Sequence, residues 1–215
     1  MNYKKLIIDS GVRMLNAGFT VETWGNISAR DPETGYVYLT PSGMDYLTCT
    51  EEDVVVCDID GKVIEGKRKP TIETGLHLAI YKARPEVMAV VHTHPIYSTI
   101  FSCMGEDIPL IIDEAAQTLG GVCKTCKYEL PGTNELANVC AEALSSESNA
   151  CLLQSHGAVC VGESMEGAFK VAKVLEVTAQ IYYMIKATGG NPKALSDENI
   201  KAMQNFVKYH YGQGK

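Results

Sequence analysis

Apolar residues recur at helical spacing in several long segments of the chain. In residues 3–17 they stand at Leu6, Ile7, Val12, Met14 and Leu15, and a glycine follows at position 18. Apolar residues that are spaced three or four positions apart lie on one face of a helix. The same kind of pattern, with a proline after residue 84 and a serine at 196 as N-cap, predicts further helices. The predicted helices cover residues 3–17, 73–84, 97–104, 134–144, 165–187 and 196–209.

Shorter apolar runs bounded by glycine, proline or aspartate predict strands. They cover residues 24–29, 36–40, 54–58, 62–65, 87–91, 108–112, 151–153 and 158–161. Asp60-Gly61 lies between two of them and predicts a hairpin turn. Because these short strands alternate irregularly with helices, the pattern indicates one α/β domain over residues 1–215. Its sheet should be largely antiparallel or mixed, in contrast to a doubly wound parallel sheet.

Composition and charge narrow the classes of partner. The 215 residues are ample for a full hydrophobic core, and the formal net charge is −7. Lys67-Arg68-Lys69 is the main basic run, so the electrostatic footprint of a nucleic-acid-binding protein is missing. No apolar run approaches the length of a membrane span, and the apolar run near the N-terminus is too short for a signal peptide. We therefore expect a cytoplasmic protein that binds neither nucleic acid nor membrane.

The chain has eight cysteines, which in an intracellular protein are expected to be reduced thiols. Cys123 and Cys126 form a single CxxC motif. A zinc ribbon needs a second such pair, and the sequence has none. The pair is therefore expected to be structural, with a redox or metal role as the alternative.

Two histidines stand at the end of the predicted strand 87–91. Residues i and i+2 of a strand point to the same side, so His92 and His94 should direct their imidazoles to one place. His156 ends a second apolar run, next to Gly157. Three imidazoles at two strand ends, with one coordination position left open, are typical of a catalytic zinc site.

Glu73 begins the helix that precedes the histidine strand. One interpretation is a carboxylate that stabilises the helix N-terminus. The other is a general base beside a metal-bound substrate. His77 lies one helical turn further on, either as a fourth metal ligand or as a buried helix histidine.

Two glycine-containing loops and a threonine suggest a phosphate site. Gly25-Asn26, Ser42-Gly43 and Thr71 offer backbone N–H groups and hydroxyls, which can cradle a phosphate without a fixed charge. Taken alone, each loop is better explained as an ordinary turn. The chain has neither a P-loop nor a dinucleotide-binding glycine motif, so nucleotide binding has no support.

Taken in order, these segments resemble the class II aldolase/adducin family. The matching segments are Gly25-Asn26-Ile27-Ser28, Thr40-Pro41-Ser42-Gly43, Pro70-Thr71-Ile72-Glu73, Val91-His92-Thr93-His94 and Gln154-Ser155-His156-Gly157. The resemblance runs from the first helix nearly to the C-terminus. It implies a three-layer α/β/α sandwich around a mainly antiparallel sheet, and a cyclic homotetramer with active sites between subunits.

The resemblance also assigns roles to residues. His92, His94 and His156 match the zinc ligands, and Glu73 matches the catalytic carboxylate. The phosphate-binding positions of the family match Gly25, Asn26, Ser42, Gly43 and Thr71. Tyr209 resembles a tyrosine that reaches the active site of a neighbouring subunit.

The implied activity is zinc-dependent cleavage of a ketose 1-phosphate, L-fuculose 1-phosphate or a close relative. The products would be dihydroxyacetone phosphate and a short aldehyde such as L-lactaldehyde. Alternatives within the family are a pentulose phosphate 4-epimerase and a methylthioribulose phosphate dehydratase. Epimerase relatives tend to carry aspartate at the position of Glu73, which argues against the first. A non-catalytic, adducin-like interaction module would be expected to lose ligand positions, whereas this chain keeps three histidines and Glu73.

Two departures from the family pattern affect the substrate. Ile72 stands where the family often has a second hydroxyl residue, so phosphate binding must depend on Thr71 and the loops. The segment 111–115 lacks a tyrosine that some relatives carry nearby. The group that protonates the aldehyde oxygen is therefore left open, and the candidates are Tyr209, Tyr211, Asp113 and Glu114.

Overall fold

The computed structural model describes residues 1–144 and 147–212. Its strands are β1 (Asn26–Arg30), β2 (Val37–Leu39), β3 (Val55–Cys57), β4 (Val63–Glu65), β5 (Ala89–Thr93), β6 (Lys124–Cys126), β7 (Ala150–Leu153) and β8 (Gly157–Gly162). Its α-helices are α1 (Tyr3–Asn16), α2 (Thr74–Ala83), α3 (Ile96–Met104), α4 (Asp113–Leu119), α5 (Asn134–Ala143), α6 (Met165–Ala187) and α7 (Asp197–Tyr209). A short 3-10 helix spans Glu51–Asp53.

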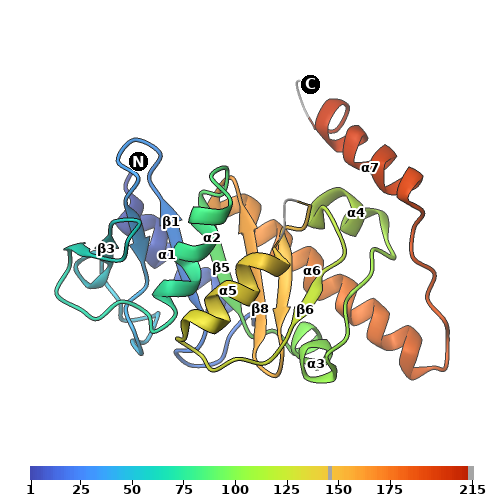
Figure 1. Cartoon of the computed structure of the whole chain (residues 1–215), viewed down its shortest axis with the longest axis horizontal. Coiled ribbons are helices and arrows are strands. Elements are labelled where there is room, and N and C mark those ends of the chain that lie inside the picture. The colour runs from blue at the N-terminus through green and yellow to red at the C-terminus, as the bar shows by residue number, and fades with distance from the viewer. Residues whose placement is uncertain (145–146, 213–215) are drawn as a thin grey trace.

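The described strands form one sheet in the order β4-β3-β2-β1-β5-β8-β7-β6 (Figure 1). Every neighbouring pair is antiparallel except β6 with β7, which is parallel. The prediction of a mainly antiparallel sheet is therefore confirmed. β5 lies between β1 and β8, and all five of its residues are buried, as expected for a strand covered on both faces.

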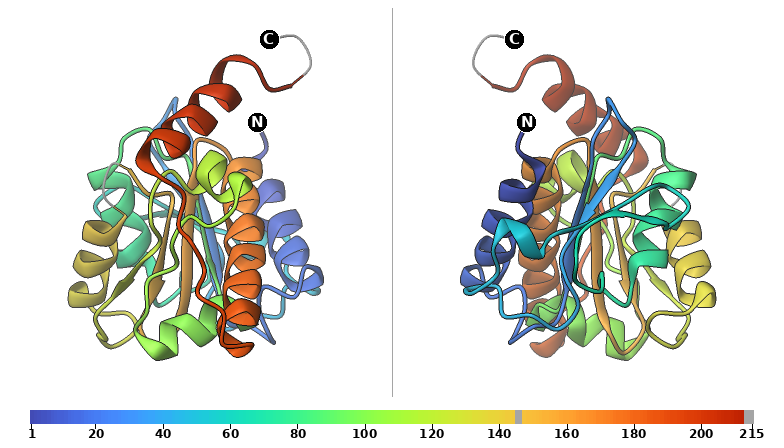
Figure 2. Two further views of the ribbon diagram at one scale, coloured as in Figure 1. Left: turned by 90° about the vertical axis from the view of Figure 1, so that its right-hand side faces the viewer. Right: turned by 90° about the vertical axis from the view of Figure 1, so that its left-hand side faces the viewer.

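Helices cover both faces of the sheet, which confirms the three-layer α/β/α sandwich (Figure 2). One core joins the sheet to α1, α3, α4 and α6, and the other joins it to α2 and α5. β5 contributes to both by strand alternation: Ala89 and Val91 belong to the first core, and Val90 to the second. His92 continues the alternation toward the layer of α2, whose first residue follows Glu73.

The predicted strand 108–112 is wrong. Its main-chain pairing is limited to one isolated bridge, between Ile108 and Cys123. Further along, the Leu110 carbonyl accepts from the N–H of Leu195 in the connection before α7, and Ile112 is the N-cap of α4. Ile108 and Leu110 are buried in the core that also contains residues of α4 and α6, so their apolar pattern reflects burial in an extended segment. The short helix α4 and the three-residue strand β6 are elements that the sequence pattern did not predict.

The last helix lies at the margin of the molecule. Ser196 caps α7 by accepting from the N–H of Asn199 at 3.3 Å, as its sequence predicts. None of the residues of α7 is buried, and the helix projects beyond α4 (Figure 1). Among the described helices, none is long and apolar enough to cross a membrane.

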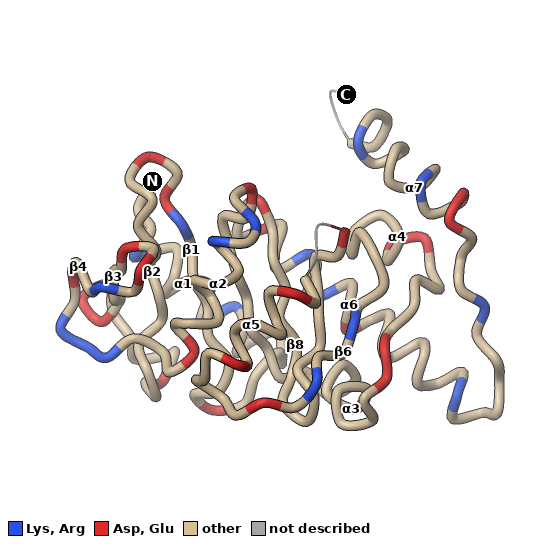
Figure 3. The backbone as a smooth tube through the Cα atoms, viewed as in Figure 1, with Lys and Arg blue, Asp and Glu red and all other residues tan. Residues whose placement is uncertain are grey.

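Charged residues of both signs occur throughout the chain (Figure 3). Acidic and basic residues are interspersed along the chain, and the basic run 67–69 follows β4 at one edge (Figure 3).

Cys123 and Cys126 are both buried free thiols, and the Cys126 thiol donates to the Val139 carbonyl at 3.3 Å. Burial raises the pKa of Cys123, so this thiol is expected to be unreactive.

Candidate metal centre and active site

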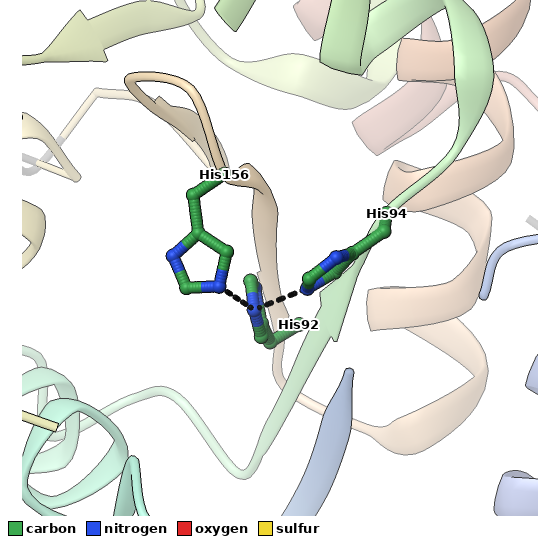
Figure 4. A group of neighbouring side chains, drawn as sticks. All are labelled: His92, His94 and His156. Atoms are coloured by element: carbon green, nitrogen blue, oxygen red, sulfur yellow. Dashed lines mark hydrogen bonds between the residues drawn. The ribbon is translucent and has the colours of Figure 1, made fainter. Parts of the chain in front are cut away.

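The three predicted histidines come together at one end of the sheet (Figure 4). His92 and His94 come from the end of β5, and His156 comes from the turn between β7 and β8. The Nε2 atom of His92 lies 2.9 Å from that of His94 and 3.3 Å from that of His156. Strand alternation therefore places His92 and His94 as predicted, and the β7–β8 turn supplies the third ring.

The donor set fits a divalent metal. Three nitrogen ligands around a tetrahedral zinc would lie about 3.3 Å apart, given zinc–nitrogen bonds of about 2.0–2.1 Å, and the structure shows similar separations. The Nδ1 atom of His92 lies 3.0 Å from the carbonyl oxygen of Ala158. An N–H donated there leaves the Nε2 lone pair free for a metal, which is the usual outer contact of a metal-bound histidine. Of the described residues, these three form the group of possible metal ligands.

Burial keeps His94 and His156 neutral, which is the form that binds metals. Burial and, to a smaller extent, the neighbouring His92 lower the pKa of His94 to about 3 and that of His156 to about 4. Burial also lowers the pKa of His77 to about 3. Without a metal, His77, His94 and His156 should therefore stay unprotonated well below neutral pH.

These pKa values predict how stability depends on pH. Between about pH 6.5 and pH 4.5 an unfolded chain protonates its histidines, whereas folded His77, His94 and His156 stay neutral. The unfolded state then binds more protons, so the free energy of unfolding of metal-free protein should fall as the pH is lowered through this window. Urea unfolding of chelator-treated protein at several pH values measures it. A constant stability across the window would contradict the neutral, buried assignment.

The turn that carries His156 requires an unusual backbone. Ser155 has a positive φ of 55°, and its N–H donates to the Ser102 carbonyl of α3 at 3.1 Å. At Gly157, an added Cβ would lie 2.4 Å from the carbonyl oxygen of Thr93 and 3.1 Å from Cδ2 of His94. Only glycine permits the two strand ends, and therefore the histidines, to approach this closely.

We expect Gly157→Ala to damage the metal site. The added methyl group must push apart the segments that carry His94 and His156, and a misplaced ligand should lower metal affinity by about tenfold or more. Competition with a metal-binding dye measures the affinity. Gly167→Ala is the matched control, because a Cβ there has its nearest contact at 3.3 Å, with the Ser164 hydroxyl. Equal metal affinity in the two variants would show that the close approach does not position the ligands.

Glu176 of α6 is a site-supporting residue that sequence reasoning missed. Its carboxylate accepts from the N–H groups of Tyr97 and Ser98, each at 2.8 Å, and from the Ser98 hydroxyl at 2.7 Å. Helix α3 begins directly after His94 and Pro95, and proline cannot cap it with a side-chain oxygen. Glu176 thus caps α3 from another helix and anchors the backbone beside His94. A carboxylate 78 residues away in sequence carries no local signal of this role.

Glu73 lies against the histidines, as the interpretation of a general base requires. It is 3% exposed, with Oε2 at 3.2 Å from His92 Nε2 and Oε1 at 3.7 Å from His156 Nε2. Burial alone would raise its pKa, but His92, a hydrogen bond from Asn26 and His156 together bring the pKa below the ordinary value. Glu73 is the N-cap residue of α2, yet its side chain makes no capping hydrogen bond. Its carboxylate therefore faces the histidines and leaves the helix N-terminus uncapped.

His77 is the buried helix histidine of the two interpretations offered. It is fully buried, and its ring nitrogens contact the Asn26 side-chain oxygen at 2.5 Å and the Ser28 hydroxyl at 2.6 Å. Both nitrogens are therefore used within the protein, and a fourth metal ligand is not available from this ring.

The predicted phosphate positions line one pocket with Glu73 and two of the histidines. The cavity is about 200 Å³. Its lining residues include Gly25, Asn26, Ser42, Gly43, Thr71, Glu73, His94 and His156, together with Trp24, Ile72 and Pro131. Within the described chain, no Lys or Arg lines it. Any phosphate bound by this pocket would depend on neutral donors and the N-terminus of α2.

Two main-chain N–H groups of the predicted phosphate segments are already used within the protein. The Ser42 N–H donates to the Lys69 carbonyl at 2.9 Å, and the Thr71 N–H donates to the Thr40 carbonyl at 3.1 Å. Those two amides are therefore occupied. The Thr71 hydroxyl oxygen accepts from the Glu73 N–H at 3.3 Å, which leaves its hydrogen available for a ligand.

Four predicted candidates do not join the pocket within one copy of the chain. Asp113 and Glu114 lie in the exposed first turn of α4. Tyr209 and Tyr211 are 57% and 56% exposed at the end of α7. In Figure 1 and Figure 2, α7 lies at the top of the molecule, whereas α3, which starts beside the histidines, lies at the bottom. Any contribution of these tyrosines would have to be made to another copy.

Comparison with known proteins identifies the family. Residues 5–183 match the model of the class II aldolase and adducin N-terminal domain. The chain belongs to the class II aldolase/adducin family. It is 37% identical to the 5-deoxy-D-ribulose 1-phosphate aldolase of Bacillus thuringiensis serovar kurstaki, over 97% of this chain and 95% of that protein. It is 30% identical to an L-ribulose-5-phosphate 4-epimerase of Salmonella paratyphi B, over 98% of both chains.

A solved structure agrees with this family assignment. An L-fuculose 1-phosphate aldolase superposes with a TM-score of 0.92 at 33% identity, covering 96% of each chain. The resemblance seen in the sequence is therefore confirmed, and this class II aldolase/adducin protein is an enzyme, a metal-dependent aldehyde-lyase. Its precise substrate and metal are not fixed by the family, which also contains the epimerase.

Proposed function

We propose that this protein is a zinc-dependent aldolase that reversibly cleaves the C3–C4 bond of a ketose 1-phosphate, yielding dihydroxyacetone phosphate and a short aldehyde. The observation that supports it is the position of Glu73. A buried carboxylate lies beside three converging imidazoles and in the same pocket as the hydroxyls of Ser42 and Thr71. A base between a metal site and neutral phosphate donors is the arrangement that proton removal next to a carbonyl requires.

In the proposed reaction each side chain has one task. His92, His94 and His156 would hold the metal, which when bound supplies a Lewis acid for the substrate carbonyl. Asn26, Ser42 and Thr71, with the Gly25 and Gly43 loops, would hold the phosphate and so set where the carbon chain lies. In the direction of bond formation, Glu73 takes a proton from the hydroxyl-bearing carbon next to the carbonyl. In cleavage it returns that proton.

The relatives suggest which ketose phosphates to test. Cleavage between C3 and C4 would release acetaldehyde from 5-deoxy-D-ribulose 1-phosphate and lactaldehyde from L-fuculose 1-phosphate. Both aldehydes end in a methyl group, and both reactions leave the same three-carbon phosphate for the pocket described here. Our proposal therefore includes both substrates as close relatives of each other.

The first experiment is a cleavage assay with both ketose 1-phosphates, before and after chelator treatment and after zinc is restored. We expect zinc-dependent release of dihydroxyacetone phosphate, detected by coupled reduction. L-ribulose 5-phosphate is assayed in parallel for epimerisation. Metal-loaded protein that releases no dihydroxyacetone phosphate but epimerises the pentulose phosphate would replace the aldolase proposal with the epimerase alternative.

We further propose a homotetramer in which Tyr209 completes the site of a neighbouring copy. Tyr209 is 57% exposed on a helix without buried residues and does not line the pocket of its own copy, which supports this proposal. Tyr209→Phe should lower kcat about tenfold or more, through loss of an acid or base group, without a change in metal content.

Subunit mixing tests whether the site is shared. Glu73→Gln and Tyr209→Phe copies, mixed under conditions of subunit exchange, would together form some sites with both native residues. Activity above the sum of the two separate variants is expected. Exchanged mixtures with no such gain, or a Tyr209→Phe enzyme with native turnover, would remove Tyr209 from the site.

A further inference from the structure

Behind Glu73, a chain of buried polar side chains runs from the pocket into the protein. The Asn26 Nδ2 donates to Glu73 Oε2 at 2.8 Å, and the Asn26 Oδ1 lies 2.5 Å from Nε2 of His77. Nδ1 of His77 lies 2.6 Å from the Ser28 hydroxyl, which in turn lies 2.8 Å from the hydroxyl of Tyr81. All five side chains are buried, with 6% exposure or less.

The direction of every hydrogen bond in this row of five side chains follows from the charge of Glu73. An ionised carboxylate only accepts, so Asn26 must present its NH₂ group to it and its oxygen to His77. A neutral imidazole has one N–H, and Asn26 requires it on Nε2. Nδ1 then accepts from Ser28, and the Ser28 oxygen accepts from Tyr81.

The opposite arrangement is unfavourable. With the proton on Nδ1, His77 would accept from the Asn26 NH₂, and the Asn26 oxygen would face Glu73 Oε2 at 2.8 Å. Two oxygen acceptors would then meet in a buried place without a hydrogen between them, which is unfavourable. The tautomer of His77 and the end of the Asn26 amide that faces Glu73 are therefore fixed together.

The contact with Asn26 also distinguishes the two oxygens of Glu73. Oε2 is held by Asn26, whereas Oε1 is buried without a hydrogen-bond partner among the described residues. Oε1 lies on the side of His156. A held Oε2 and an unpartnered Oε1 leave one oxygen ready to take a proton from a substrate carbon.

We infer that His77 is a positioning residue: through the amide of Asn26 it holds Oε2 of Glu73 and leaves Oε1 as the oxygen that takes the substrate proton. This inference rests on the proposed role of Glu73 as base. Asn26 then has two roles. One hydrogen of its NH₂ group binds Glu73, and the second remains for the phosphate. An amide cannot relay a proton readily, so the chain orients the base and does not carry its proton away.

Two substitutions of nearly equal size separate the two ring nitrogens. In His77→Gln the carboxamide reaches the position of Nε2 and can still donate to Asn26. In His77→Asn it reaches only the position of Nδ1 and serves Ser28, leaving the Asn26 oxygen without a donor. A purely structural role would make the two variants similar, whereas a positioning role makes them differ in kcat.

The assay follows exchange of a dihydroxyacetone phosphate carbon-bound proton with D₂O, which requires the base but no aldehyde. We expect His77→Asn to lower the exchange kcat by about tenfold to a hundredfold, as for a small misplacement of a catalytic group. KM and zinc content should change little, and His77→Gln should stay within about threefold of wild type. Folded, zinc-loaded variants with equal kcat values would overturn the inference.

A second measurement needs no substrate. In ¹⁵N NMR spectra of zinc-loaded protein at neutral pH, the His77 ring, assigned by its loss in His77→Gln, should carry its proton on Nε2. A proton on Nδ1 would overturn the inference. Wild-type enzyme without exchange or cleavage, but with the Nε2 proton in place, would instead reject the proposed function while leaving the hydrogen-bond chain standing.

Discussion

Glu73→Gln should lower both cleavage and proton exchange by about a hundredfold to ten-thousandfold, the usual contribution of a general base. Glutamine has nearly the same shape and can keep an oxygen toward Asn26, but it cannot take a proton. The metal ligands are untouched, so zinc content should stay at the wild-type value. Steady-state kinetics with the ketose 1-phosphate and the D₂O exchange assay measure the loss.

Glu166→Gln is the matched control for this change. Glu166 is an exposed carboxylate paired with Arg13, outside the pocket, and its loss should leave turnover within about twofold because exposed ion pairs contribute little. Turnover that survives Glu73→Gln as well as it survives Glu166→Gln would show that another group removes the proton. Loss of zinc in Glu73→Gln would instead show that the carboxylate supports the metal site.

His92→Ala is expected to have the other large effect, loss of both metal and activity. His92 lies between the other two imidazoles, and its Nε2 is within 3.3 Å of both. Since outer contacts of metal ligands alone are worth about tenfold to a hundredfold in affinity, loss of a ligand should cost at least about a hundredfold. Metal analysis after dialysis and dye competition measure it.

The fold should survive this substitution, because the rest of β5 is buried in both cores and keeps its pairing with β1 and β8. A melting curve of metal-free His92→Ala, compared with metal-free wild type, tests this. His210→Ala serves as control for metal content, since His210 lies in the exposed segment after α7. Full zinc occupancy in His92→Ala would contradict the ligand assignment.

Much of the candidate site could be predicted from local sequence patterns. His92 and His94 converge because side chains two apart on a strand share a face, and this requires no knowledge of other segments. Glu73 was placed at the start of a helix by the proline and hydrophobic pattern around it, and the structure makes it the N-cap residue of α2. The helices 134–144 and 165–187 were predicted for the same local reason.

Contacts between distant segments were not predictable in this way. Glu176 caps α3 across 78 residues, and Asn26 divides its amide between Glu73 and His77, 47 and 51 residues away. The incorrect prediction of a strand at 108–112 has the same cause, dependence on a distant partner. Burial makes a segment apolar, but whether it pairs as a strand depends on a partner that the segment itself does not reveal.

The amino-acid sequence by itself determined the family, and it indicated the three histidines, Glu73 as candidate base and the candidate phosphate loops, because these depend on residue types in a fixed order and on strand and helix periodicity. Only the tertiary structure decided how they work together. Antiparallel pairing of β5 with β8 brings His156 to His92, the β1–β5 pairing sets Asn26 opposite His92, and packing of α2 on the sheet brings Glu73 and His77 to the Asn26 amide. The physical reason is that a buried polar group must find its partner, and that partner usually lies far away in the chain.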